Sequence, residues 1–481
     1  MQFNSYIFIL LFMPAVFILY FLGNKIGYSF GKIILIIGSA IFYIYGGWQA
    51  AVLLAASILV NYCFSLCISK VKRCKKAFLA IDIVINVALL LYFKYSNFFI
   101  TNVNQLLDKD YQLKELILPL GISFFSFQQI MYVVNIYKEN IHLNFVDYLL
   151  YILYFPKILM GPLADPADII QKFNDKDLKR VNWENVTESL KIFSFGLFKK
   201  LVIADTFAKG VAWGYSNIDG STSMDWILIT LFYTFQIYFD FSGYCDMAVG
   251  VSRLLNIDLP INFDSPYKAL SIRDFWKRWH MTLTGFLTKY VYIPLGGSKR
   301  GRARTYINTM IVFIVSGIWH GANWTFILWG ILHGAFSIFD RLFDKVQSRL
   351  SEVVRWFSTF TVVNLLWLLF RSESITQWLE LLKKIFTFQD MSVSDNLIGQ
   401  FKIPETSFLF DILHLENIDT AVRGLPMLIF IVFSMAICLI PENNYRSIKK
   451  NNVVIMAIAA VAFVWGILCL GGESVFVYFN F

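Results

Sequence analysis

The sequence predicts an all-α polytopic membrane protein with about 11 to 13 transmembrane or re-entrant helices. Of its 481 residues, 57% are hydrophobic and only 16% are charged, whereas soluble domains have about 45–50% apolar and about 25% charged residues. The mean hydropathy of +0.59 over the whole chain requires many apolar segments rather than one anchor. These segments are continuous, unlike the alternating strands of a membrane β-barrel. The composition therefore excludes a water-soluble enzyme, a disordered tail and a secreted disulfide scaffold.

The candidate helices are continuous apolar runs, because about 20 apolar residues cross the roughly 30 Å hydrocarbon core of a bilayer. Such runs lie at residues 6–22, 29–46, 49–69, 77–93, 116–137, 146–160, 190–213, 226–244, 305–319, 324–340, 353–370, 424–440 and 453–470. We interpret the first as an uncleaved span rather than a signal peptide, since no Lys or Arg precedes it. Residues 388–422 are predicted to form one long loop, and residues 1–481 a single integral membrane domain.

Positive charge indicates how the chain crosses the membrane, because cytoplasmic loops carry an excess of Lys and Arg. Five cations follow the third run, at Lys70, Lys72, Arg73, Lys75 and Lys76. This loop is therefore predicted to be cytoplasmic and the N-terminus to lie outside. Three cations precede the last run, at Arg446, Lys449 and Lys450, which places the C-terminus outside as well. We attribute part of the net charge of +9 to loops beside anionic membrane lipids, and expect no nucleic-acid partner.

The apolar pattern breaks between residues 119 and 341. Polar, Gly and Pro residues interrupt the runs there, for example at Pro156, Asp240 and Pro294. Irregular backbone at membrane depth is tolerated only where protein or a water-filled cavity surrounds it. This stretch is therefore the predicted functional core, and the outer runs are its scaffold.

Histidine is the first candidate for chemistry in this core. His320 ends a strongly apolar run, and Gly317 and Gly321 flank it, which predicts open space for a ligand. A desolvated imidazole stays neutral near pH 7 and can accept a proton. A core histidine bonded to one backbone carbonyl is the structural alternative.

Two further histidines lie in the same stretch. His280 follows Trp276 in an amphipathic segment that fits either an interfacial helix or the wall of a cavity. His333 is interpreted as structural. The six cysteines form no CxxC motif and no Cys/His cluster, so no metal site is expected.

Two aspartates, Asp240 and Asp246, follow directly on an apolar run. Acidic residues near a membrane interior need partners, and Arg253 or Arg273 is available to pair with them. A structural ion pair and a catalytic role both remain open for Asp240.

A basic, glycine-containing loop lies at residues 294–304. It carries four cations, Lys299, Arg300, Arg302 and Arg304. Backbone N–H groups and Arg side chains favour anions, so this loop is a candidate site for the phosphates of a nucleotide-containing donor. Its spacing does not match a P-loop. A positively charged cytoplasmic turn is an alternative compatible with donor binding.

Several motifs resemble those of the membrane-bound O-acyltransferase (MBOAT) family. They occur in family order, at residues 121–125, 155–162, 238–250, 275–283, 292–297 and 316–334. The stretch around Ser316-Gly317-Ile318-Trp319-His320-Gly321 is the most specific of them. The resemblance covers at least residues 119–341, which marks this range as an MBOAT catalytic core. The chain is most similar to the bacterial alginate O-acetyltransferase subunit I type.

The resemblance implies helices around a central funnel in which an acyl group moves to a hydroxyl. His320 matches the family's presumed catalytic histidine and His280 a second essential position, and we expect His320 to act as general base. Four further residues are expected to line the funnel, Asp240, Trp276, Trp319 and Asn323. No bound cofactor is implied, and acetyl-CoA is the expected acyl donor.

The C-terminal tail, residues 473–481, resembles the aromatic ending of this bacterial subgroup. Tyr478 in this tail is a candidate relay that passes the acyl group to an extracytoplasmic partner. The alternative is an aromatic anchor at the membrane interface.

The sequence thus predicts an O-acetyltransferase of the bacterial plasma (inner) membrane. It is expected to move acetyl from cytoplasmic acetyl-CoA across the membrane for O-acetylation of a cell-surface or secreted polysaccharide, such as alginate or another envelope glycan. By resemblance, an extracytoplasmic SGNH-type transferase completes the step. A D-alanyl exporter for teichoic acid is the alternative within the family, and a polytopic transporter or flippase is the alternative from another class.

Overall fold

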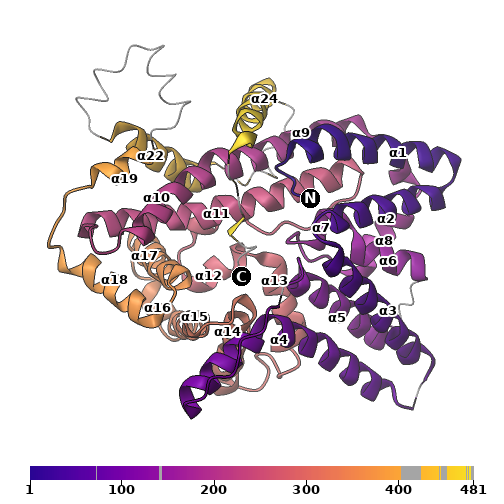
Figure 1. Cartoon of the computed structure of the whole chain (residues 1–481), viewed down its shortest axis with the longest axis horizontal. Coiled ribbons are helices and arrows are strands. Elements are labelled where there is room, and N and C mark those ends of the chain that lie inside the picture. The colour runs from indigo at the N-terminus through magenta and orange to yellow at the C-terminus, as the bar shows by residue number, and fades with distance from the viewer. Residues whose placement is uncertain are drawn as a thin grey trace. The chain divides into compact units, whose positions relative to one another are not determined.

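The computed structural model describes residues 1–71, 73–116, 118–139, 144–401, 424–441, 443, 445, 452–472, 474, 476 and 477. Among these residues every regular element is a helix (Figure 1), as the continuous apolar runs predict. The chain divides into two compact units, Met1–Ser194 with Tyr244–Ile261, and Phe195–Gly243 with Asn262–Phe481. The prediction of one integral domain stays a prediction, and each unit is described by itself.

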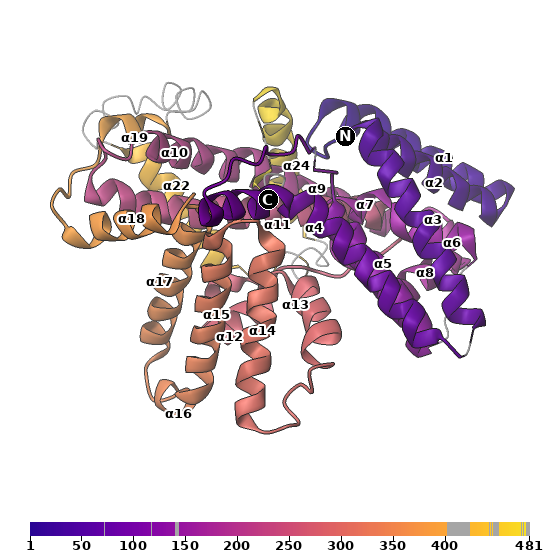
Figure 2. The same cartoon turned by 60° about the horizontal axis from the view of Figure 1, so that its bottom comes forward.

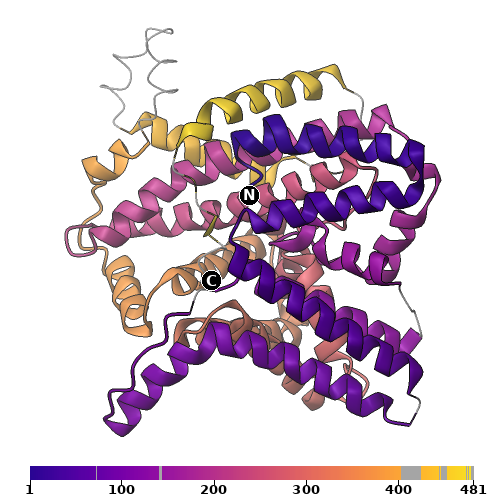
Figure 3. The ribbon, with the colours of Figure 1, turned by 45° about the vertical axis from the view of Figure 1, so that its right-hand side comes forward.

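The first unit contains the N-terminal helices. They are η1 (Ile7–Phe12), α1 (Met13–Ile26), α2 (Tyr28–Ile44), α3 (Trp48–Lys70), α4 (Lys75–Leu107), α5 (Ile122–Glu139), α6 (Phe145–Leu153), α7 (Phe155–Ile158), α8 (Pro166–Asn174) and η2 (Asp177–Lys179). Helices α1 and α2 form an antiparallel pair (Figure 3). They approach closely at Gly31, where an added Cβ would lie 2.0 Å from the Asn24 side chain.

Two helices pass from one unit into the other, α9 (Trp183–Phe198) and α11 (Ser223–Leu254). The second unit contains the other helices of the described residues. They are η3 (Lys199–Ala204), α10 (Asp205–Ser216), η4 (Pro266–Lys268), α12 (Ile272–Arg278), α13 (Met281–Leu287), η5 (Thr288–Tyr292), α14 (Arg302–His320), α15 (Trp324–Leu342), α16 (Asp344–Gln347), α17 (Glu352–Arg371), α18 (Ile375–Thr387), α19 (Asp395–Gly399), α22 (Leu425–Leu439), α24 (Val453–Leu468) and η6 (Cys469–Gly471).

Within the described part of the chain, five helical segments are long and apolar enough to cross a membrane, namely Ile7–Ile26, Trp48–Lys70, Lys75–Leu107, Glu352–Arg371 and Val453–Gly471. Helices α2 and α22 are apolar but shorter. Each of these segments overlaps a predicted run, and α4 continues to Leu107, 14 residues beyond the end of the run predicted at 77–93. Other predicted runs are divided, and the run at 146–160 is split into α6 and α7 at Tyr154. Pro156 follows in the first turn of α7, where a missing N–H costs nothing.

Some charged segments named in the sequence analysis fall partly outside the described residues. The predicted loop at 388–422 begins with described residues, including α19, and from residue 402 onward it lies outside them. Lys72, Arg446, Lys449 and Lys450 also lie outside them.

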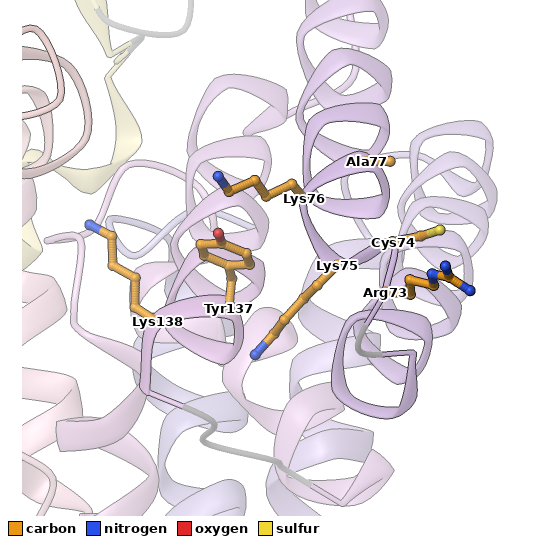
Figure 4. A pocket seen from close by; sticks show the side chains of 7 residues that line it. All are labelled: Arg73, Cys74, Lys75, Lys76, Ala77, Tyr137 and Lys138. Carbon is orange, nitrogen blue, oxygen red and sulfur yellow. The ribbon is translucent and has the colours of Figure 1, made fainter.

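Cations that precede and begin α4 line a hollow in the first unit (Figure 4). Its volume is about 730 Å³, and its lining residues are Arg73, Cys74, Lys75, Lys76, Ala77, Tyr137 and Lys138. Lys75 Nζ lies 5.4 Å from the centre of the Tyr137 ring. Positive charge therefore gathers at the start of α4, and the cytoplasmic position of this loop stays a prediction.

Helices α14 and α15 run side by side in the second unit (Figure 2). Glycines make this approach possible, because an added Cβ at Gly317 would lie 2.3 Å from the backbone oxygen of Phe326. An added Cβ at Gly330 would likewise lie 2.4 Å from the backbone oxygen of Phe313. The backbones of the two helices therefore contact each other beside the C-terminal end of α14, where His320 lies.

Candidate active site

His280 lies in the tight turn between α12 and α13, and only 1% of its surface is exposed. Its backbone adopts the left-handed conformation, with φ at 45°, which is uncommon outside glycine. Two hydrogen bonds hold the neighbouring backbone. Met281 N–H donates to Asn262 O over 2.9 Å, and Asp264 N–H donates to Arg278 O over 2.9 Å. Such conformations persist where the surroundings fix them, and they concentrate at functional sites.

The side chain of Asn262 sets the tautomer of His280. Asn262 Oδ1 accepts hydrogen bonds from Thr282 N–H (3.1 Å) and from the Thr282 hydroxyl (2.7 Å), so this atom is the amide oxygen. His280 Nδ1 lies 3.3 Å from the same oxygen and therefore carries the ring proton. The lone pair of the imidazole is then on Nε2. Burial also lowers the pKa of His280 to about 3, because the interior disfavours the charged ring.

Aromatic rings connect His280 to His320. The ring centres of His280 and Trp319 are 6.2 Å apart, and those of Trp319 and His320 are 4.8 Å apart. On its other sides His320 meets the rings of Trp329 (5.1 Å) and Phe370 (5.2 Å). His320 is 4% exposed. The two histidines predicted to act together thus flank one tryptophan, in a largely apolar setting.

The glycines beside His320 do not leave open space, contrary to the prediction. An added Cβ at Gly321 would lie 2.1 Å from the Phe326 ring, and one at Gly317 would meet the Phe326 backbone. The small residues serve the close packing of α14 on α15, and Phe326 fills the space that the sequence analysis assigned to a ligand.

Gly317→Ala is expected to destabilise the protein by roughly 1–3 kcal/mol, since an added methyl group must displace the backbone of α15. Thermal unfolding of the purified protein in detergent measures this change. Gly285→Ala in α13 is the matched control, because an added Cβ there meets no atom within 4 Å. Equal melting temperatures for the two variants would contradict close packing at Gly317.

Trp276 is tied to the third histidine. Its indole Nε1–H donates to His333 Nδ1 over 3.2 Å, and the ring centres of Trp329 and His333 are 4.7 Å apart. Trp329 contacts both His320 and His333, so Trp276 joins the same aromatic cluster. His333 is fully buried, and its bond to Trp276 agrees with its interpretation as a structural histidine.

Asp240 forms an ion pair, but with a partner that the sequence analysis did not name. Asp240 Oδ1 lies 2.6 Å from Lys200 Nζ, whereas Arg253 and Arg273 were the predicted candidates. Arg253 instead binds Glu188 and Asp258. The prediction of those arginines is therefore wrong for Asp240, because a π-helical segment brings Lys200 to it.

The next residue along α11 connects this ion pair to the histidines. The Phe241 ring meets the His280 ring edge-on, with centres 4.8 Å apart. Asp240 is therefore adjacent in the chain to a residue that contacts His280.

Asn323 occupies a structural position. Its Oδ1 accepts the N–H of Thr325 (3.1 Å) and so caps α15, and its Nδ2 donates to the Glu373 backbone oxygen (2.8 Å). Both ends of this amide are engaged by the protein. Its role in lining a funnel stays a prediction.

The basic loop lies at the opposite end of α14 from His320. Lys299, Arg300 and Arg302 are exposed, whereas Arg304 is half-buried and donates to Leu295 O (3.4 Å). Helix α14 begins at Arg302 and ends at His320, which is about 27 Å at 1.5 Å per residue. A donor whose phosphates bind this loop must span that distance to reach His320. Donor binding by the loop stays a prediction.

Sequence reasoning missed Lys200 and Asn262. Lys200 lies inside a predicted apolar run, and an ionisable residue there is a functional candidate by default, so this signal was available. Asn262 had no such signal in the sequence, because an asparagine in a loop is common.

The candidate relay Tyr478 lies outside the described residues. Among the described residues no three His, Cys, Asp or Glu side chains gather as a metal site would require.

A family model described as the membrane-bound O-acyltransferase family matches residues 75–372. The chain belongs to this MBOAT family. The match includes His280 and His320, and it confirms the predicted family and enzyme class, a membrane O-acyltransferase.

Comparison with curated proteins shows which members of the MBOAT family the chain is similar to. The chain is 36% identical over 524 residues to a peptidoglycan O-acetyltransferase of Helicobacter pylori, covering 100% of this chain and 97% of the relative. It is 34% identical over 406 residues to a probable alginate O-acetylase of Pseudomonas putida, covering 82% of each chain. A teichoic acid D-alanyltransferase of Bacillus subtilis is 28% identical over 262 residues, covering 51% of this chain and 65% of the relative.

Proposed function

We propose that this MBOAT protein moves an acetyl group to hydroxyls of a cell-envelope polysaccharide. The carrying observation is the pair of buried histidines, His280 and His320, on either side of Trp319. Its relatives support the substrate class, because the proteins matched over most of their length are named for O-acetylation of peptidoglycan or alginate. Peptidoglycan is the first polymer to analyse, since its named relative is covered over 97% of its length.

The geometry supports distinct roles for the two histidines. His320 accepts the proton of the attacking hydroxyl, the oxygen bonds to the thioester carbonyl carbon, and the carbon–sulfur bond breaks. The proton then leaves with the thiol. His280 is a poor base, because its pKa of about 3 disfavours holding a proton at neutral pH. Its Nε2 lone pair suits it to orient a hydroxyl by accepting a hydrogen bond.

The donor, the partner and the membrane sides complete the proposal. Acetyl-CoA supplies the acyl group from the cytoplasm, and the four-cation loop at 299–304 is its candidate phosphate site. The protein resides in the bacterial inner membrane with both termini outside. An extracytoplasmic SGNH-type transferase passes the group to the polymer, with Tyr478 as candidate relay.

Two other functions are less well supported. A D-alanyl exporter shares the family, but the D-alanyltransferase relative matches only 51% of this chain at 28% identity. A transporter or flippase would explain interrupted helices, yet it has no need for two histidines around one tryptophan. A pair of histidines, which can accept and donate protons, favours acyl transfer over transport.

Mass analysis of surface polymers tests the proposal. Cells that lack this chain, and the same cells with it restored, are digested and their glycan fragments compared for acetyl esters. In cells without the chain, we expect the acetyl mass increment, about 42 Da per ester, to be lost from the fragments. It is expected to return when the chain is restored. An unchanged acetyl content together with loss of D-alanyl esters would support the exporter instead.

A further inference from the structure

Three ionisable side chains form a buried cluster in the second unit, apart from the histidines. Lys200 Nζ lies 2.6 Å from Asp240 Oδ1 and 2.8 Å from Asp205 Oδ1. The Lys200 side chain is fully buried, that of Asp240 is 2% exposed, and that of Asp205, at the edge of the cluster, is 17% exposed. We refer to Lys200, Asp205 and Asp240 as the buried cluster.

A π-helical segment builds this cluster. In η3 the N–H of Asp205 donates to the backbone oxygen of Lys200, five residues earlier, so the two side chains lie on one face of the helix. π-Helical turns are rare and occur frequently at functional sites. Gly243 lets η3 approach α11, because an added Cβ there would lie 2.8 Å from Gly196 O and 3.1 Å from Lys200 N. Lys200 can therefore reach Asp240, one turn before Gly243.

The C-terminal tail contacts every member of the buried cluster. Val477 N–H donates to Asp240 Oδ2 over 3.0 Å. The Phe476 ring is fully buried and lies 4.4 Å from Lys200 Nζ. Ser474 forms a hydrogen bond with Asp205. Each of three described tail residues thus contacts a different side chain of the cluster.

The contacts between the tail and the buried cluster are of the kinds that proteins use to bind ligands. One carboxylate oxygen of Asp240 binds Lys200, and the other receives the backbone N–H of the tail. The ammonium group of Lys200 faces an aromatic ring, an attraction that strengthens when water is absent. The bond to Asp240 is charge-assisted, and such bonds are roughly twice as strong as neutral ones.

Two consecutive residues of α11 connect the tail to the candidate active site. Asp240 binds the tail, and the next residue, Phe241, packs on His280. Helix α24 leads to the tail and packs on η3 and on the end of α9 directly before it, where the Phe198 and Trp465 ring centres are 5.6 Å apart. The residue that binds the tail, Asp240, is therefore the direct neighbour in the chain of Phe241, which contacts His280.

We propose that the buried cluster is a docking site for the chain's own C-terminal tail. Lys200 and Asp240 are positioning residues that hold the tail beside the histidines. The link to catalysis rests on the proposed function, whereas docking itself does not. Asp240 accordingly serves as an anchor for the tail rather than as an acid or base.

Digestion of the tail tests docking on the full-length protein in detergent. Carboxypeptidase Y trims the C-terminus, and the intact mass reports where trimming stops. We expect trimming of the wild-type chain to stop before it removes Val477. Val477→Pro removes the N–H donor, while its ring also fixes the local backbone, and it is expected to release the tail, with trimming past residue 477 at least about tenfold faster. Val477→Ala retains the N–H and is expected to remain docked.

A pair of double variants isolates the acceptor atom. Lys200→Met with Asp240→Asn removes both charges but leaves an amide oxygen for the Val477 N–H. Lys200→Met with Asp240→Leu removes that acceptor as well. Both variants leave Asp205 in the same surroundings, so the difference between them reports the bond to the tail. The first is expected to resist trimming and the second to be trimmed rapidly.

Acetylation of the envelope polymer then tests the positioning role. Val477→Pro is expected to lower acetylation at least about tenfold while the amount of protein and its melting temperature stay unchanged, which a purely structural role would not produce. Equal trimming of Val477→Pro, the Leu double variant and wild type would overturn docking. Rapid trimming with full acetylation would overturn the positioning role. Trimming needs no acetyl transfer, so a failure of the proposed function leaves the docking result readable.

Discussion

His320→Ala is expected to reduce acetylation of the envelope polymer to background, a loss of about 10²–10⁴-fold. In the proposed function the imidazole accepts the proton of the attacking hydroxyl, and the neighbouring rings of Trp319, Trp329 and Phe370 cannot replace it in that role. Acetyl esters on glycan fragments, measured by mass spectrometry in cells with equal amounts of protein, give the result.

The matched control for this variant is Ile318→Ala on the same helix. Ile318 is 37% exposed, so its truncation leaves the aromatic cluster intact and acetylation is expected to persist. Full acetylation by His320→Ala would refute the base role. It would also favour a transporter, which has no use for a general base.

The aromatic cluster around His280 and His320 was largely predictable from sequence, because its members lie in compact motifs. His280 follows Trp276 by four residues, and Trp319 precedes His320 directly, so each motif carries two members of the cluster. The contact between Trp319 and His280 was less accessible, because it joins segments about 40 residues apart that meet only in the folded chain.

Long-range polar partners could not be predicted. Lys200 and Asp240 are paired across 40 residues, and the sequence offered Arg253 as an equally suitable cation. The π-helical turn that brings Lys200 to Asp240 has no recognised sequence signature. The Val477 contact uses a backbone N–H, which every residue except proline carries.

The ends of some helices were predictable from sequence, whereas the role of a glycine in packing was not. The runs at 49–69 and 353–370 correspond to α3 and α17 within a few residues, because uniform apolar sequence and capping side chains such as Ser351 define their ends. Glycine was misleading beside His320, since Gly317 permits helix packing as readily as ligand access. Only the position of Phe326 distinguishes the two.

Asn262→Asp is expected to introduce a new acid limb into the pH–rate profile of acetyl transfer. In the wild type, the pKa of His280 is about 3, so this ring stays neutral across pH 5–8 and contributes no limb there. A carboxylate in place of the amide oxygen 3.3 Å from Nδ1 favours the charged ring and raises its pKa by about 1–3 units. As pH falls through the raised value, Nε2 becomes protonated and can no longer accept a hydrogen bond, so the rate declines.

The profile is measured in membrane vesicles from the native cells, which retain the proposed extracytoplasmic transferase, with labelled acetyl-CoA and a soluble glycan acceptor. Asn262→Ala is the control, because it removes the oxygen without adding charge. It is expected to lower the rate by a similar factor at every pH, since the Thr282 contacts and the orientation of His280 are lost together. A profile for Asn262→Asp parallel to that of the wild type would show that a neutral His280 is not required. The role of this histidine would then be confined to holding the turn between α12 and α13.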